Sequence, residues 1–577
     1  MTMEKQGWES SKDTLSLRKQ IDQYVKQAAG RSIPQPLFSD YQKFIEQGSR
    51  AESEAVYFER RKQLAAFGLY LQYHRKTEER EEEVLNYFQE LLWSVTNEFS
   101  WCVAAHLPQD KGGFLENPGF QIDLFAAETA DTLAEILTIH SDIIHPFLQG
   151  HIRRQITERI FEPFLTKSWW WETVPSNWCA VCCGCIGMAA LLLEQGERKE
   201  QLLTKVDRSL VHYLNSFGED GACEEGIGYW VYGFGYYTYY IAMRKELNAE
   251  FHIDEKEMEK LRKLAEFPGV VQMSEFSFVP FSDVPERTLL PTGLLSYLQQ
   301  EYGVNMPACT QITSFDFDHC FRFAHISRDL WWTDSRIFHT ELQREAVYLK
   351  DRQWLLQRQK GYFFAVKGGN NREQHNHNDT GSFLFAIEGE LLLADLGAGR
   401  YTADYFGEKR YEHVHTRSRY HNLPLIQGKE QTSTAEECKV EQVVLNGDTV
   451  EITLELGKLY PVPELISLKR TVRSEMDKGC ILLTDTIRAA KAVELEESFV
   501  TYIRPILLED GKLAISGEKG QLILSYENNI LDYFLVEFSV ENHYGEKKEA
   551  YRVGLRTKSR NENMTLKILF SYKSSDN

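Results

Sequence analysis

Two histidines two positions apart precede an apolar run in the segment NNREQHNHNDTGSF, residues 370–383. The sequence that follows, FLFAIEGELLLAD, predicts a β-hairpin that turns at Glu388-Gly389. A two-residue hairpin places the start of its first strand beside the end of its second strand. We therefore expect Asp395, at the end of the hairpin, to lie close to His377 at its start.

A second histidine, His421, enters another apolar run in TRSRYHNLPLIQG. Two imidazoles and one carboxylate, from His377, Asp395 and His421, match a zinc ligand set that leaves one coordination position open. Calcium is a poorer match because it prefers shells made only of oxygen. The alternative is that each residue has a purely structural role, since a single histidine or aspartate at a strand end is usually hydrogen-bonded there.

The other histidine of the pair, His375, precedes the predicted ligand His377 by two residues. If residues 375–377 are extended, the two side chains point the same way. His377 could then hold the metal while His375 reaches a substrate with an imidazole, a group whose charge changes near neutral pH.

A cluster of cysteines, Cys179, Cys182, Cys183 and Cys185, also has the residue type of a metal site. However, the stretch predicts a helix of small residues, and no second cysteine pair follows at zinc-ribbon spacing. Buried free cysteine behaves as a small hydrophobic residue. We interpret the ten cysteines of the chain as free thiols.

The formal net charge of −20 argues against nucleic acid as a partner, since no basic stripe offsets it. An anionic substrate would have to be held by local arginine, lysine, histidine or metal charges. Aromatic residues reach 12% of the 577, with 28 tyrosines and 33 phenylalanines. They indicate large cores, or clefts lined by tyrosine.

No secretory signal is visible at the N-terminus, which reads MTMEKQGWESSKDTLSLRKQ. The longest nearly apolar run, residues 179–193, is shorter than the roughly 20 residues that span a bilayer. We therefore expect a soluble, cytoplasmic protein without a membrane partner. A homo-oligomer is compatible with the sequence, which does not define the oligomeric state.

The spacing of apolar residues along the chain changes between about residues 325 and 350. Before this point amphipathic patterns predominate, as in QLLTKVDRSLVHYLNSFG, and they predict stacked helical hairpins. Beyond it alternating runs predominate, as in KVEQVVLNGDTVEITLEL with a turn at Asn446-Gly447. The prediction is a multidomain α+β protein, with a helical domain over 1–335 and an antiparallel β-sandwich over 336–577.

The segment KGGNNREQHNHNDTGSFLFAIEGELLLADLGAGRYT, followed by RSRYHNLPLIQG, resembles the core of heparinase II/III-like polysaccharide lyases. PSNWCAVCCGCIGMAALLL and EDGACEEGIGYWVYGFGYY resemble the helical motifs of the same family. The resemblance implies an incomplete (α/α) toroid joined to an antiparallel β-sandwich, with a cleft between them. It also implies a carbon–oxygen lyase that cleaves an acidic oligosaccharide or polysaccharide containing uronic acid by β-elimination.

Such a reaction requires neutralisation of the uronate carboxylate, a base at C5 and an acid at the leaving oxygen. By resemblance, Asn177 contacts the carboxylate, Tyr229 is base, acid or both, and His375 is a base or a carboxylate partner. The implied divalent metal, a structural Zn²⁺ on the three donors named above, fixes the loop beneath the site. The predicted substrate contacts are Trp178, Tyr232, Arg372, Arg400, Tyr401 and Tyr405.

Two other classes of function stay open. A metal-dependent glycan hydrolase would use the metal to carry a water nucleophile. A non-catalytic relative would bind sugars without cleaving them. The sequence does not choose between glycosaminoglycan-like and alginate-like uronate glycans.

Overall fold

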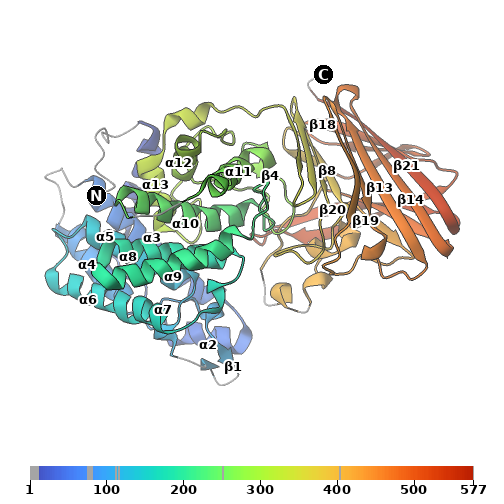
Figure 1. The fold of residues 1–577 in the computed structure, drawn as a ribbon. Helices are drawn as coiled ribbons and strands as arrows, with labels where there is room; N and C mark the ends of the chain where they lie inside the picture. The colour runs from blue at the N-terminus through green and yellow to red at the C-terminus, as the bar shows by residue number, and fades with distance from the viewer. Residues whose placement is uncertain are drawn as a thin grey trace.

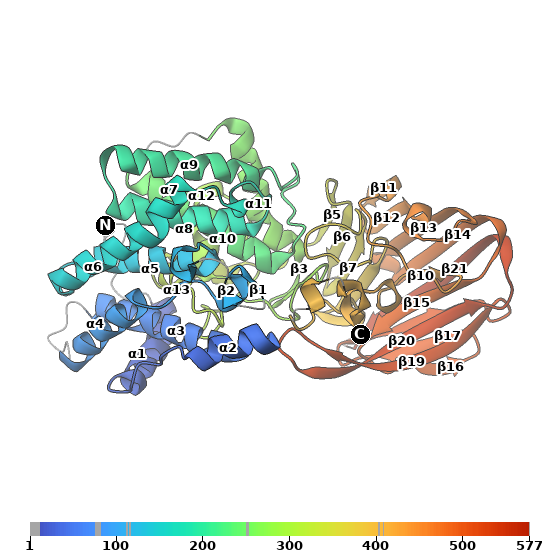
Figure 2. The same cartoon turned by 90° about the horizontal axis from the view of Figure 1, so that it is seen from below.

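The computed structural model describes residues 12–74, 82–110, 113–114, 117–249, 253–401, 404–407 and 409–575. Helices fill one end of the molecule and β-sheets the other (Figure 1). The view from below shows the same division (Figure 2). The helices are α1 (Leu15–Ala28), α2 (Phe38–Gln47), α3 (Ala51–Tyr73), α4 (Glu82–Thr96), α5 (Leu124–Ile139), α6 (Pro146–Ile156), α7 (Glu162–Thr166), α8 (Asn177–Leu193), α9 (Gly196–Leu214), α10 (Ile227–Glu246), α11 (Glu255–Val271), α12 (Thr292–Tyr302) and α13 (Phe323–Trp332).

Helix α8 lies inside the helical half, packed against α5, α9 and α10. Its small residues permit this close packing, because a Cβ at Gly187 would lie only 2.4 Å from the Tyr240 ring. The four clustered cysteines lie on this helix, and all are buried free thiols. The prediction of a helix of small residues is therefore confirmed for this segment.

The β-half contains a five-stranded sheet of order β5-β6-β7-β8-β9, an eight-stranded sheet and a four-stranded sheet. All pairings in the three sheets are antiparallel. The eight-stranded sheet has the order β11-β12-β13-β14-β21-β18-β17-β16, and the four-stranded sheet β10-β15-β20-β19.

The strands of these sheets are β5 (Glu345–Leu349), β6 (Trp354–Gln359), β7 (Tyr362–Lys367), β8 (Phe383–Ile387), β9 (Glu390–Leu393), β10 (Pro424–Ile426), β11 (Lys439–Asn446), β12 (Thr449–Glu455), β13 (Leu465–Glu475), β14 (Cys480–Val493), β15 (Leu495–Thr501), β16 (Ile506–Glu509), β17 (Lys512–Ser516), β18 (Gly520–Ser525), β19 (Leu531–Glu541), β20 (Lys547–Thr557) and β21 (Asn561–Ser574). Two short hairpins, β1 (Gln109–Asp110) with β2 (Gly113–Phe114) and β3 (Gln272–Ser274) with β4 (Ser277–Phe278), belong to the helical half.

The five-stranded sheet is the middle layer of the molecule, and both faces of its central strands β6, β7 and β8 are buried. Along β7, Phe363 joins the core of the helical half, whereas Phe364 joins the core of the larger sheets. Leu384 and Phe385 of β8 divide in the same way. Because successive side chains of a strand point to opposite faces, the sheet packs against both halves at once.

Two predicted hairpins are present. β8 and β9 flank Glu388 and Gly389, which both have positive φ, as a tight hairpin turn requires. The β11–β12 turn lies at Gly447-Asp448, one residue later than predicted. The proposed domain boundary after residue 335 falls between α13 and β5.

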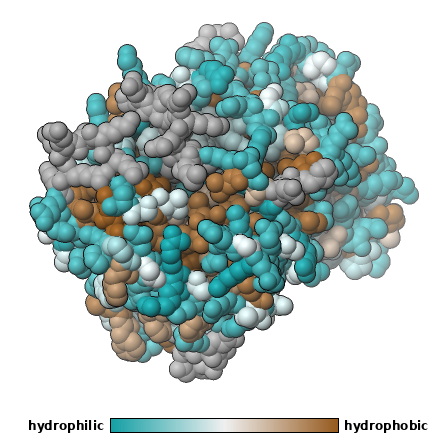
Figure 3. Space-filling model, turned by 60° about the vertical axis from the view of Figure 1, so that its left-hand side comes forward, coloured by the Kyte–Doolittle hydropathy of each residue, from teal (hydrophilic) through white to brown (hydrophobic). Residues whose placement is uncertain are grey.

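Figure 3 looks onto the helical end, where apolar residues form a band between polar ones. Exposed Trp93 and Phe147 belong to this half. Among the helices of the described residues, none combines the length and the apolar character needed to cross a bilayer.

Candidate active site and metal centre

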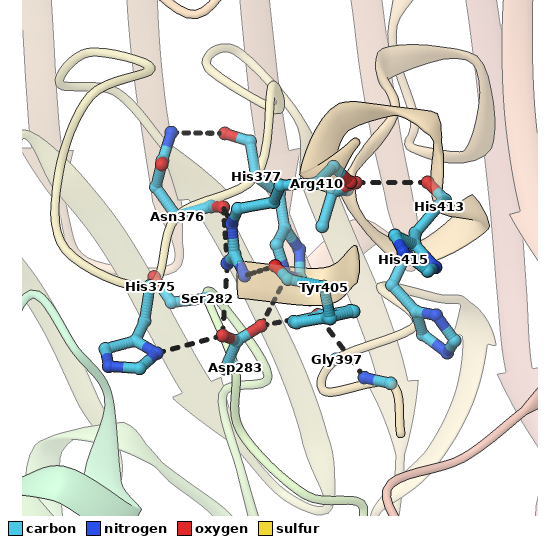
Figure 4. A network of polar contacts seen from close by, with 12 residues as sticks. Ser282, Asp283, His375, Asn376, His377, Gly397, Tyr405, Arg410, His413 and His415 are labelled. Atoms are coloured by element: carbon cyan, nitrogen blue, oxygen red, sulfur yellow. Dashed lines mark hydrogen bonds and ion pairs between the residues drawn. The ribbon is translucent and has the colours of Figure 1, made fainter. Parts of the chain in front are cut away.

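The carboxylate of Asp283, from a loop of the helical half, is the centre of the site (Figure 4). It accepts hydrogen bonds from His375 Nδ1 (3.0 Å), His377 Nε2 (3.1 Å), Tyr405 Oη (2.6 Å) and Arg410 Nη2 (3.0 Å). Burial alone would raise its pKa, but the hydrogen bonds from the two histidines and the charge of Arg410 hold the pKa of Asp283 well below its usual range. Asp283 is therefore an ionised acceptor, and each of its four partners must donate.

Two glycines hold the Asp283 loop in place through Val284. Gly226, which precedes α10, has φ +89° and a Cβ there would lie 2.3 Å from the Val284 side chain. Gly397, after β9, has φ +60° and a Cβ there would lie 2.4 Å from the Val284 carbonyl oxygen. That oxygen accepts a hydrogen bond from Ala398 N. Backbone atoms of the helical half and of the β-half are therefore in direct contact at this loop.

The histidine loop, residues 368–382 between β7 and β8, carries His375 and His377. A buried ion pair anchors it. Lys367 Nζ lies 2.7 and 3.0 Å from the two oxygens of Asp379, and both side chains are fully buried. Asn371 adds hydrogen bonds to Gln431 and Thr380. A buried ion pair with satisfied neighbours is costly to break, so it anchors this loop to the end of β7.

The prediction that residues 375–377 are extended is wrong. His375 has φ +54°, in the left-handed region, and lies in a turn. The two imidazoles nevertheless reach the same carboxylate, from opposite sides of it (Figure 4). The turn leaves the His375 side chain 20% exposed, whereas that of His377 is fully buried.

Tyr229 and His375 are in direct contact. Their ring centroids lie 4.2 Å apart, with an interplanar angle of 26°. The Tyr229 hydroxyl lies 2.9 Å from the Tyr401 hydroxyl. Burial and the charge of Asp283 raise the pKa of the Tyr229 phenol, and the hydrogen bond with Tyr401 opposes them. Tyr229 is therefore protonated at neutral pH.

Asn177 is the first residue of α8 and is buried. Its backbone N–H is directed at the carboxyl group of Glu225, which precedes α10. Burial raises the pKa of Glu225 to about 7, against the charge of His375. The start of α8 and the start of α10 therefore meet beside the Tyr229–His375 pair. Trp178, half-buried, follows Asn177 and lies 4.8 Å from the His106 ring centroid.

The predicted metal donors converge, since ligand atoms of His377, Asp395 and His421 lie within 4.8 Å of one another. His377 donates through Nε2 to Asp283, and His421 donates through Nε2 to the His415 carbonyl (2.9 Å). In the neutral imidazoles both Nδ1 atoms therefore carry lone pairs.

Asp395 Oδ1 accepts from Gly397 N, and its Oδ2 lies 3.2 Å from His421 Nδ1. Asp395 Oδ2 and both Nδ1 atoms have no hydrogen-bond partner in the described chain. Three buried lone pairs facing one another are unfavourable unless a metal cation, or a proton held between His421 Nδ1 and Asp395 Oδ2, lies between them. The donor set therefore fits a divalent metal, and two nitrogens with one oxygen favour Zn²⁺ over Ca²⁺.

The other predicted contacts are more dispersed. Tyr232 donates to Glu128 (2.5 Å), and its ring lies 4.0 Å from the Arg322 guanidinium carbon. Arg372 is exposed on the histidine loop. Arg400 forms an exposed ion pair with Glu541 at 3.1 Å.

Sequence reasoning missed Asp283, Arg410 and Glu225. Asp283 lies in FSDVPERT, a polar loop with no periodic pattern around it. Glu225 stands four residues before Tyr229, so its proximity to the site could have been predicted from the helix start. Asp283 and Arg410 become neighbours only when the two halves dock.

Residues 349–548 match the family model described as heparinase II/III-like, C-terminal. This part of the chain is a heparinase II/III-like domain. The domain contains the histidine loop, all three metal donors and both Tyr401 and Tyr405. The helical half, which supplies Asn177, Tyr229 and Asp283, lies outside the matched range. No curated protein sequence matches the chain.

Solved structures extend the similarity in fold to both halves of the chain. The heparan sulfate lyase HepC from Pedobacter heparinus has a TM-score of 0.63 at 12% identity, covering 100% of this chain and 85% of that one. A heparinase III structure has a TM-score of 0.65 at 12% identity, covering 100% and 87%.

A more distant neighbour is the Streptomyces coelicolor A3 chondroitin AC lyase in complex with chondroitin sulphate. It has a TM-score of 0.57 at 9% identity, covering 97% of this chain and 79% of that one. At these identities the comparison shows the fold, a helical toroid followed by antiparallel sheets, as predicted. The structural neighbours named here are polysaccharide lyases.

Proposed function

We propose that the protein is a polysaccharide or oligosaccharide lyase that cleaves a uronic-acid-containing glycan by β-elimination. The observation that carries the proposal is the contact between Tyr229 and His375 above the ionised Asp283. The heparinase II/III-like domain and the lyase fold support it. The product would carry an unsaturated uronate at its new end.

His375 is the proposed base at C5. Its Nδ1–H donates to Asp283, so the neutral imidazole carries its lone pair on Nε2. The negative carboxylate also stabilises the imidazolium that forms when Nε2 accepts the C5 proton. Partial exposure of this side chain gives a sugar ring access to it.

Tyr229 is the proposed acid. Its raised pKa keeps the phenol protonated, so it can deliver its proton to the leaving glycosidic oxygen. Tyr401, at 2.9 Å, can hydrogen-bond to the phenolate that results. The amide of Asn177 is proposed to donate a hydrogen bond to the substrate carboxylate, which loses basicity as C5 loses its proton.

We propose that His377, Asp395 and His421 hold one structural Zn²⁺. When bound, the ion would neutralise the three facing lone pairs and tie the loop after β7 to the loops after β9. The burial of all three donors argues against the hydrolase alternative, because a metal that activates water must be accessible to substrate.

The test is a panel of uronate oligosaccharides, with product followed by ultraviolet absorbance and by mass. An absorbing product whose mass equals substrate minus the leaving saccharide, without added water, is expected. Saturated ends that have gained water would overturn the lyase in favour of a hydrolase. Binding without turnover of any member would favour the non-catalytic alternative.

A further inference from the structure

Three guanidinium groups beside the proposed site, those of Arg410, Arg352 and Arg322, are already neutralised by carboxylates of the same chain. Arg410 is bound to Asp283, with Nη2 3.0 Å from Oδ2. Arg352, beneath the histidine loop, pairs with Glu224 and lies 3.7 Å from Glu373. Neither guanidinium carries an uncompensated charge.

Arg322 shows the same pattern on the helical side. It lies over the ring of Tyr232, which is three residues beyond Tyr229 on α10. Its Nη1 contacts both oxygens of Asp318 (2.8 and 2.9 Å), and its Nε lies 3.1 Å from Glu128. Burial opposes the charge of Arg322, which nevertheless lowers the pKa of Asp318 to about 2. Two carboxyl groups therefore face one guanidinium.

This arrangement is unfavourable for sulfate recognition. A sulfate group bears a full negative charge and is bound by an arginine or lysine whose positive charge is not already neutralised by a carboxylate. An incoming sulfate would have to displace a carboxylate from Arg322, leaving that carboxylate partly buried and unpaired. The net charge of −20 adds long-range repulsion of any polyanion.

The surface next to Asn177 is aromatic rather than cationic. Trp170 is 60% exposed and its ring centroid lies 4.9 Å from that of Trp178. Trp178 contacts His106, which Asp123 orients through a 2.9 Å contact with Nδ1. Ring faces of this kind bind the apolar faces of pyranoses and require no charge on the sugar. The exposed Arg372, which has no ion pair within the described residues, is available for a carboxylate.

We propose that the substrate is a uronate oligosaccharide that bears its carboxylates but no sulfate groups. This inference rests on the proposed lyase activity and specifies the substrate class of the same site. The specificity arises because aromatic faces bind the sugars and Arg372 is left for a carboxylate, while Arg410, Arg352 and Arg322 are occupied by carboxylates of the chain.

The experiment compares glycans that share a backbone and differ only in sulfate: chondroitin with chondroitin sulfate, and N-acetylheparosan with heparan sulfate. We expect kcat/KM, from the absorbance of the unsaturated product, to be at least about tenfold higher for the unsulfated member of a cleaved pair. Equal or faster cleavage of the sulfated member would overturn the inference and leave the lyase proposal intact. No unsaturated product from any unsulfated uronate glycan, alginate included, would overturn both.

A variant tests the role of Arg322 directly. Asp318→Asn keeps the side-chain shape but removes the charge that occupies the guanidinium. We expect the sulfated-to-unsulfated ratio of kcat/KM to rise by about tenfold, because the freed guanidinium can form one ion pair with sulfate. Asp334→Asn is the matched control, because Asp334 pairs with the exposed Arg336 at 2.6 Å. A ratio that stays the same in a folded Asp318→Asn protein would contradict the proposed exclusion of sulfate.

Discussion

Asp283 supports two groups of side chains that differ in their access to solvent. On one side, His377, Asp395 and His421 are at most 3% exposed and direct their free lone pairs at one another. On the other side, His375 is 20% exposed and stacks on Tyr229. The left-handed turn at His375 sends neighbouring histidines to these different environments.

The difference indicates that one carboxylate can orient two imidazoles for separate tasks. Toward the buried group it fixes the tautomer that leaves a metal-binding Nδ1. Toward the exposed group it fixes the tautomer that leaves a basic Nε2. The largest test of this comparison should therefore disrupt both groups at once.

Asp283→Asn is expected to lower kcat by about 10⁴-fold, as when a carboxylate that fixes a catalytic imidazole is replaced by an amide. It should also reduce the bound metal, because His377 loses the acceptor that holds its tautomer. Steady-state kinetics and metal analysis of one preparation measure both effects. Asp404→Asn, at an exposed position, is the control. Loss of activity with full metal content would mean that the two groups are independent.

Tyr229→Phe should separate the groups. The variant lacks the proton donor but keeps the ring that stacks on His375, so we expect kcat to fall by about 10³-fold with unchanged metal content. Tyr236→Phe, in the core on the same helix, is the control for loss of a phenol from α10. Turnover within a few fold of wild type would remove Tyr229 from the mechanism.

Glu225→Gln tests the electrostatics beside the exposed group. In the wild-type protein the pKa of Glu225, about 7 in the folded state, lies above the ordinary 4.5. The folded state therefore binds this proton more tightly than the unfolded state does. The free energy of unfolding should therefore fall as pH rises from about 4.5 to 7, by about 3 kcal/mol from this group. Glutamine cannot ionise, so Glu225→Gln should lose that part of the pH dependence. Parallel denaturation curves of both proteins across this range would contradict the assignment.

His377→Ala acts on the buried group alone. We expect loss of the bound metal, and a fall in activity of about 10- to 100-fold because the loop under His375 is no longer fixed. His339→Ala, at an exposed histidine, is the control. Equal metal content in the variant and wild type, measured by elemental analysis, would reject the ligand set.

Arg400→Ala is expected to have the smallest effect. Its exposed ion pair with Glu541 contributes at most about 1 kcal/mol, and we expect kcat/KM to change by less than about twofold. A larger change in KM alone would support the predicted contact between Arg400 and the substrate.

Local patterns predicted the parts of the site that lie close together in the chain. The β8–β9 hairpin brought Asp395 to His377, because strand alternation and turn chemistry encode that pairing. The small residues of α8 similarly predicted a buried helix with free thiols. The fold class followed from the change in periodicity.

Contacts made by domain docking had no such signal. Asp283 lies 92 residues before His375 in sequence, and Tyr229 lies 172 residues before Tyr401. Neither alternation nor helical spacing reports which loop of one half faces which loop of the other. The positive φ of His375 was missed for a related reason, since tertiary hydrogen bonds impose a conformation that a histidine rarely adopts alone.

The middle position of the five-stranded sheet restricts how the protein could be divided into fragments. A fragment that began at β5 would expose Trp354, Phe363 and Leu384 to water. Together they would form an apolar surface of the kind that drives association. A fragment that ended at α13 would uncover the matching wall of the helical half. The chain must therefore be expressed, engineered and swapped between relatives as one piece.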